Sequence, residues 1–133
     1  MAGNLNVLLS SMKLNDFGPD LKFMIDVIKG SITFLMQHLI NGNFSYKAGV
    51  TDTKLVHFCH GAPGVVTALA KFMEMFPEVG ISMGLKEVLD VSLNHIWKYG
   101  VLKKGFGLCH GISGNAYTFI SPSIQQVFHD RSA

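Results

Sequence analysis

One stretch decides how this sequence folds: Lys103-Lys104-Gly105-Phe106-Gly107-Leu108-Cys109-His110-Gly111-Ile112-Ser113-Gly114. Its core, Cys-His-Gly-x-x-Gly, occurs once more upstream, as Cys59-His60-Gly61-Ala62-Pro63-Gly64. The chain has two cysteines, and both stand in this motif, each just before an apolar segment. Two thiols and two imidazoles in matched settings indicate a metal site, because zinc prefers sulfur and nitrogen ligands in a tetrahedral arrangement.

Spacing alone leaves the form of that site open. Cys59 and Cys109 could share a metal with one following histidine, or with both His60 and His110 in a closed structural site. Each cysteine could instead be a small buried hydrophobe, and a disulfide is the weaker alternative in a reducing compartment. We expect the adjoining helix N-termini and the lysine pair to lower the thiol pKa values.

The composition limits the class of protein. At 133 residues the chain has room for one domain. Apolar residues make up 48% and charged residues 15%, against about 25% charged in an average soluble domain. Some elements should therefore be buried on most sides, or the chain is part of something larger. The net charge is +2 and no basic block stands out, so the charge does not indicate a nucleic-acid-binding protein.

Apolar periodicity predicts an all-α fold without a β-sheet. We expect helices over residues 3–14, 20–41, 64–76, 83–99 and 112–120, and little regular structure after Ile120. Residues 21–40 are the most apolar region, but they are interrupted by charged side chains, so we expect no membrane span there. His38, His57 and His95 are expected to be ordinary surface or hairpin residues.

The order of the segments contains a repeat. Three small-residue openings, with Gly3, Gly64 and Gly114 at equivalent positions, each precede an apolar helix. A longer amphipathic helix lies between consecutive openings. This pattern predicts stacked helical hairpins, with three inner helices side by side and roughly parallel and two outer helices covering them.

Residues 57–64 and 97–117 closely resemble the LanC-like proteins, eukaryotic relatives of bacterial lanthionine cyclases. The resemblance is strong over residues 54–120 and weaker from residue 1, and Phe58 stands where the family usually has tryptophan. It implies a partial α/α toroid, in which residues 1–133 form part of a single domain and residues 121–133 form a divergent tail.

The resemblance also implies a set of site residues. The zinc ligands of the family correspond to Cys59, Cys109 and His110, whereas His60 matches a residue that is not a ligand. Three protein ligands leave a fourth position open, as in catalytic zinc sites. Lys104 matches the lysine at the glutathione site. The implied reaction is Michael addition of a zinc-bound thiolate to dehydroalanine or dehydrobutyrine, with glutathione and dehydroamino-acid-containing peptides or proteins as partners.

The catalytic histidine of the family would fall before residue 1, and further helices on both sides are missing. We therefore expect a fragment that is inactive alone. The alternative function is a zinc- and glutathione-binding scaffold or signalling adaptor without turnover. The chain has no recognisable secretory signal, so the expected location is the cytoplasm, with peripheral association at the plasma membrane as an alternative.

Overall fold

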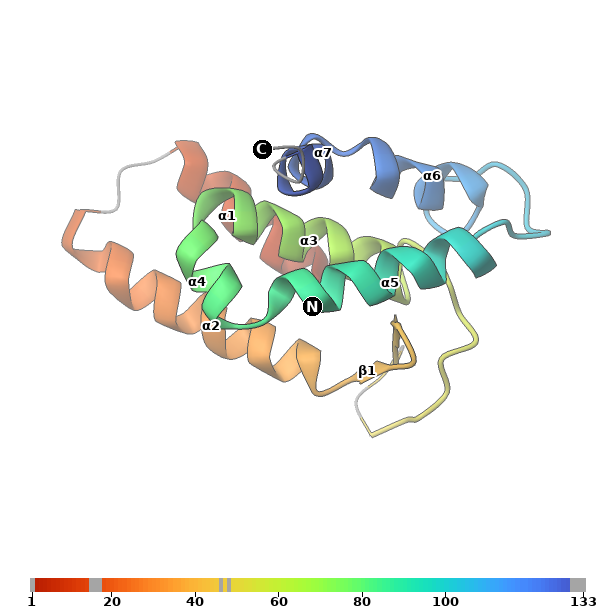
Figure 1. Cartoon of the computed structure of the whole chain (residues 1–133), viewed down its shortest axis with the longest axis horizontal. Coiled ribbons are helices and arrows are strands. Elements are labelled where there is room, and N and C mark those ends of the chain that lie inside the picture. Colours follow the sequence, from red (N-terminus) through yellow and green to blue (C-terminus); the bar gives the residue numbers. More distant parts are fainter. Residues whose placement is uncertain (1, 15–17, 46, 48, 130–133) are drawn as a thin grey trace.

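The computed structural model describes residues 2–14, 18–45, 47 and 49–129, and helices account for most of them (Figure 1). The fold class is all-α, as the periodicity predicted. The elements in chain order are α1 (Ala2–Leu14), the 3-10 turn η1 (Gly18–Asp20), α2 (Leu21–Met36), β1 (Leu39–Ile40), β2 (Asn43–Phe44), α3 (Ala62–Met75), α4 (Pro77–Ser82), α5 (Leu85–Tyr99), α6 (Ile112–Ile120) and α7 (Pro122–His129).

Helix α3 forms the centre of the fold, in contact with α1, α4, α5, α6 and α7. Its sequence is apolar on nearly every face, and the side chains of Val66, Leu69 and Phe72 are fully buried. Burial of one such side chain contributes about 1.5–3 kcal/mol to the free energy of folding. This helix therefore accounts for much of the high apolar fraction noted in the sequence.

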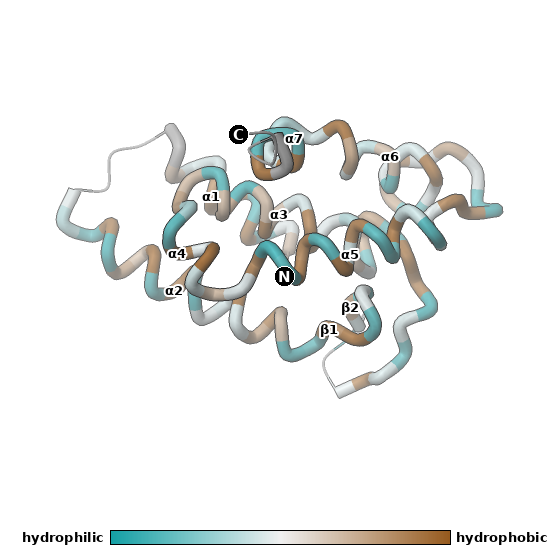
Figure 2. The backbone as a smooth tube through the Cα atoms, viewed as in Figure 1, coloured by the Kyte–Doolittle hydropathy of each residue, from teal (hydrophilic) through white to brown (hydrophobic). Residues whose placement is uncertain are grey.

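The directions of the helices agree with the predicted helical hairpins. In Figure 1, α1, α3 and α6 run in the same direction across the view, and α3 contacts both of the others. Helices α2 and α5 run back in the opposite direction (Figure 1). Figure 2 shows hydrophilic and hydrophobic segments alternating along α5, as expected of a helix with one solvent-exposed face.

The second helix is shorter than predicted, and the expectation of no β-sheet was wrong for residues 39–44. Helix α2 ends at Met36, and β1 pairs with β2 in an antiparallel hairpin. The two turn residues, Asn41 and Gly42, have φ angles of 52° and 83°. Positive φ at both positions defines a type I′ turn, for which Asn-Gly is the preferred sequence. Because each strand has two residues, the fold class is unaffected.

Two further helices, α4 and α7, were missed. Each begins with a proline, Pro77 or Pro122, that comes just after the end of a predicted helix. Proline also suits the first turn of a helix, where its missing N–H is not needed. Helix α7 packs on α3 through Ile124, and the Ser123 hydroxyl donates a 2.5 Å hydrogen bond to the Glu74 carboxylate. Residues 122–129 therefore belong to the core structure.

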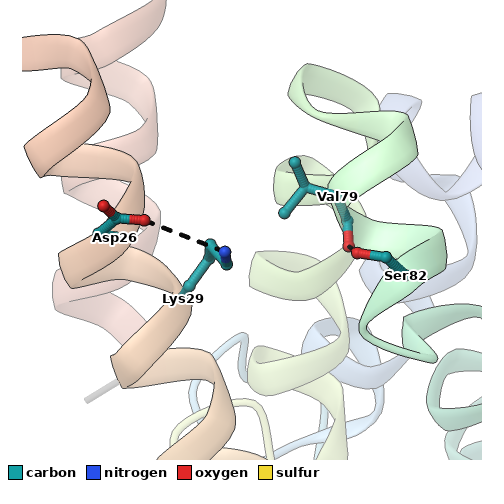
Figure 3. A network of polar contacts seen from close by, with 4 residues as sticks. All are labelled: Asp26, Lys29, Val79 and Ser82. Carbon is teal, nitrogen blue, oxygen red and sulfur yellow. Dashed lines mark hydrogen bonds and ion pairs between the residues drawn. The ribbon is translucent and has the colours of Figure 1, made fainter.

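Two polar contacts on the outer surface are local. Lys29 and Asp26 of α2 form an exposed ion pair at 4.0 Å, and Ser82 donates to the carbonyl of Val79 within α4 at 2.8 Å (Figure 3). Exposed pairs of this kind contribute about 0–1 kcal/mol, so the apolar core holds the helices together. Among the described residues, no helix combines the length and apolar character needed to cross a bilayer.

Candidate metal centre

The two Cys-His-Gly motifs meet at the end of the bundle where α3 and α6 begin (Figure 1). Cys59 lies three residues before α3, and Cys109 lies three residues before α6. The main-chain N–H of Cys59 donates a 3.0 Å hydrogen bond to the carbonyl of Cys109. Because α3 and α6 are neighbouring parallel helices, the loops that precede them come together directly.

Close backbone packing explains the last glycine of each motif. A Cβ atom at Gly64 would overlap the carbonyl oxygen of Phe58, and one at Gly114 would overlap the carbonyl oxygen of Leu108. In each motif the residue before the cysteine thus lies against the glycine six positions later. The space around Gly3 is open, so its predicted equivalence to the other two does not extend to packing.

A buried asparagine of the hairpin positions the first motif. The Asn43 side chain accepts a 2.6 Å hydrogen bond from the N–H of Ala62 at the start of α3. Its amide nitrogen donates to the carbonyls of Thr53 and Leu55 at 2.7 and 3.1 Å. Asn43 was missed in the sequence, where it reads as part of a polar loop, because its partners lie far from it in the chain.

A second buried asparagine connects the two motifs. Asn115 of α6 is 2% exposed, and its amide nitrogen donates to the carbonyls of Val56 and Gly100 at 2.8 and 2.9 Å. The first acceptor belongs to the segment that leads into Cys59, and the second ends α5. Asn115 thereby fixes α6 relative to the loops on both sides.

Three donor atoms converge at the junction of the motifs. The sulfurs of Cys59 and Cys109 and a ring nitrogen of His110 all lie within 4.8 Å of one another. Ligand atoms around a tetrahedral zinc are about 3.3–3.8 Å apart, so shifts of about 1 Å in exposed side chains complete the geometry. No other such group of His, Cys, Asp or Glu occurs among the described residues, and His60 is not part of this one.

The electrostatics of the thiols differ from the sequence expectation. Partial burial raises the pKa of Cys59, and the hydrogen-bonded Cys109 thiol raises it further. Hydrogen bonds from the main-chain N–H groups of Cys59 and His60 lower the pKa, but they do not offset these effects. The predicted lowering by helix ends and lysines was therefore wrong for Cys59. A bound cation would favour the thiolate form of Cys59.

His57 belongs to this site rather than to the surface. It is 6% exposed, and its ring centroid lies 6.1 Å from that of His110. Burial lowers the pKa of His57, and the neighbouring charges of Lys104, His110 and His60 lower it further. The expectation that His57 is an ordinary surface or hairpin residue was wrong. The exposed Lys104 side chain is thus within electrostatic reach of His57.

Space for a small molecule lies beside Cys59. A pocket of about 260 Å³ opens between the hairpin, the end of α2 and the first motif. Its walls include Cys59, His60, Phe34, Phe44 and Lys47. All three donor residues are themselves exposed, so a ligand in this region can reach them. The arrangement can hold a metal ion and leave one side of it accessible.

Comparisons with known proteins agree with this geometry. Residues 1–124 match the family described as Lanthionine synthetase C-like protein. The zebrafish (Danio rerio) protein named Glutathione S-transferase LANCL1 is 37% identical over 99 residues, which cover 74% of this chain and 24% of that protein. The Arabidopsis thaliana LanC-like protein GCL1 is 33% identical over 96 residues, which cover 71% of this chain and 21% of that protein.

The chain thus spans about a quarter of the length of these relatives. The matched region includes both Cys-His-Gly motifs and the helices that begin after them. The family match covers nearly the whole sequence, and both relatives are more than 30% identical to it, so together they show the family of this chain. The chain belongs to the lanthionine synthetase C-like family.

Proposed function

We propose that this chain provides a zinc site that activates the thiol of glutathione for addition to dehydroalanine- or dehydrobutyrine-type electrophiles. The convergence of two thiols and one imidazole within 4.8 Å carries this proposal. We further propose that residues 1–133 form part of one α/α toroid domain, as in the LanC-like proteins that the sequence resembles.

The donor set fits zinc. Cys59, Cys109 and His110 supply two sulfurs and one nitrogen, which are the atoms that zinc selects over calcium or magnesium. They are three in number and exposed, which suits a site with one open position better than a closed structural site. When bound there, zinc would lower the pKa of an incoming thiol and supply it as a thiolate.

The surrounding residues would orient the thiol substrate. The exposed ammonium group of Lys104 lies close enough to lower the pKa of His57, and it can pair with a glutathione carboxylate. The hydrogen bond between the main chains of Cys59 and Cys109 keeps the two thiols together before a metal arrives. The name of the zebrafish relative, a glutathione S-transferase, supports glutathione as the substrate class.

The test is a chimera of the zebrafish relative in which this chain replaces the segment that aligns with it. Zinc content, glutathione binding and formation of the thioether with a dehydroalanine peptide are measured, the last by mass spectrometry. We expect activity that is lost in Cys109→Ala. Lys104→Ala should weaken glutathione binding about three- to tenfold, with Lys103→Ala as the matched control.

The outcomes separate the two candidate functions. Thioether formation by the chimera supports the enzyme. Zinc and glutathione binding without any thioether product supports the alternative, a binding scaffold or adaptor without turnover. Absence of stoichiometric zinc in a folded chimera contradicts both, because each depends on the same three ligands.

A further inference from the structure

We propose that Cys59 and Cys109 are also a reversible disulfide pair, oxidised by glutathione disulfide, and that the disulfide and the bound metal exclude each other. The exclusion rests on the metal site proposed above, whereas the disulfide itself does not. Both cysteines are free thiols on exposed residues, so a small disulfide can reach either sulfur.

The main chain already holds the two residues at a suitable distance. Cys59 and Cys109 are joined by one main-chain hydrogen bond of 3.0 Å, and antiparallel strand residues that exchange two such bonds lie about 5.5 Å apart at Cα. Disulfides need a Cα separation of about 4.4–6.8 Å. The sulfurs lie within 4.8 Å of each other, and because both side chains are exposed they can rotate together without repacking the core.

The sequence leaves no competing partner within the chain, because these are its only two cysteines. Oxidation can therefore give the internal disulfide, a mixed disulfide with glutathione, or a link between two chains. A neighbouring thiol converts a mixed disulfide to the internal one quickly, since the attack takes place within one molecule. The internal disulfide should be the end product.

The reaction balances without a further reagent. The thiolate of one cysteine attacks a sulfur of glutathione disulfide, forms a mixed disulfide and releases one glutathione. The other cysteine then attacks the protein sulfur of the mixed disulfide, forms the Cys59–Cys109 bond and releases the second glutathione. Two protein thiols are oxidised, and one glutathione disulfide is reduced to two thiols, which take up the two protons that the cysteines lose.

Oxidation removes both sulfur ligands of the metal at once. A disulfide has no thiolate to donate, so His110 alone would remain of the three donor residues. Conversely, a metal that holds both sulfurs protects them from oxidation. Metal binding to the reduced form shifts the redox equilibrium by the factor 1 + [L]/Kd, so free zinc at about 100 times its Kd makes oxidation about 100-fold harder.

The experiment equilibrates the reduced, metal-free chain in anaerobic buffers with graded ratios of glutathione to glutathione disulfide. After acid quenching and maleimide labelling, intact mass gives the number of free thiols. We expect an unlabelled monomer that has lost two hydrogens. In Cys59→Ser and in Cys109→Ser, the remaining thiol should instead carry one glutathionyl group.

Several results would overturn the proposal. The first is a wild-type chain that carries two glutathionyl groups. The second is a wild-type chain that keeps both thiols free under conditions in which the single variants are modified. The third is disulfide-linked dimers as the main product. A second series, in the same buffers with zinc added, tests the exclusion separately, and we expect zinc to move the midpoint of oxidation to a higher proportion of glutathione disulfide. If zinc is shown to be bound and the midpoint of thiol oxidation is unchanged, the mutual exclusion of metal and disulfide is contradicted. If zinc does not bind at all, the proposed function fails, while the metal-free series still decides on the disulfide.

Discussion

The main-chain amide of Cys59 donates to the carbonyl of Cys109 at 3.0 Å, which makes one site of two motifs that are far apart in the sequence. Helices α3 and α6 are packed side by side, and each motif is the loop that enters one of them. The site therefore depends on the residues that fix these two loops, and not only on the three donor side chains.

Asn43→Ala should destabilise the chain by about 1–3 kcal/mol. The substitution removes the acceptor for the N–H of Ala62 and the donor to the carbonyls of Thr53 and Leu55, in a fully buried position. Urea unfolding followed by circular dichroism measures the change. Asn94→Ala, on the exposed face of α5, is the matched control and should have little effect. Equal stability of the two variants would contradict the role given to Asn43.

Gly114→Ala should destabilise the chain more than Gly3→Ala. The added methyl group at position 114 would overlap the carbonyl oxygen of Leu108, whereas nothing lies within 4 Å at position 3. Overpacking of this kind costs about 1–3 kcal/mol, and alanine in an open helical position is favourable by up to about 1 kcal/mol. The difference is read from thermal unfolding midpoints. A Gly114→Ala variant as stable as the wild type would show that the loop can move away.

His110→Ala should abolish stoichiometric zinc binding, and His60→Ala should not. Only His110 shares the group of donor atoms with the two cysteines, although both histidines are exposed and follow a cysteine. Zinc content is measured after dialysis against a weak chelator, with folding of each variant checked by circular dichroism. Loss of zinc in both variants would favour the closed four-ligand site over the open one.

The sequence predicted most of the helical framework because the framework follows from local apolar periodicity. Helix α6 has the predicted bounds, and α3 and α5 begin within two residues of theirs. The repeated motif also predicted that Cys59 and Cys109 would meet, since parallel inner helices begin at one end of the stack. These features depend on short stretches of sequence and on one repeat.

The features that were missed depend on contacts between distant residues. The role of Asn43 depends on the N–H of Ala62 at the start of α3, and His57 lies near His110 and is affected by the charge of Lys104, both far from it in the sequence. The raised pKa of Cys59 comes from burial and the neighbouring thiol, which a helix-end argument leaves out. The β1–β2 hairpin is different, because the Asn41-Gly42 pair is a typical hairpin turn sequence. It was missed because the apolar periodicity of the preceding helix was extended through residue 41.

His57→Gln should reduce the acid sensitivity of the metal-free chain. Folding lowers the pKa of His57 below 6.5, so the stabilisation is present above this pH and is lost as the pH falls through the folded pKa. The wild-type free energy of unfolding should therefore decrease as the pH falls below about 6.5, with a shallower slope in the variant. Urea midpoints across this range give the slopes, and His38→Gln is the control, because His38 is not among the groups whose charges act on His57. Identical slopes in all three proteins would contradict the assignment.

An exposed apolar surface, here called the α5–α6 face, lies at the junction of α5 and α6. Trp97, Val101 and Ile120 are 78%, 79% and 70% exposed, and Trp97 packs edge-on against Phe119 with ring centroids 5.9 Å apart. A pocket of about 220 Å³ lies between the same elements. Contiguous apolar surface of this kind promotes association with other apolar surfaces.

The chain should therefore bind the dye ANS and associate as its concentration rises. Substitution of Trp97 and Ile120 by lysine removes two of the largest apolar side chains from the α5–α6 face and adds two charges, while lysine keeps a good helix propensity. We expect weaker dye fluorescence and a lower sedimentation coefficient at high concentration in this variant. Val7→Lys is the control, because Val7 is 71% exposed on α1, outside this face. Equal dye binding by the double variant and the control would show that the apolar surface responsible lies elsewhere.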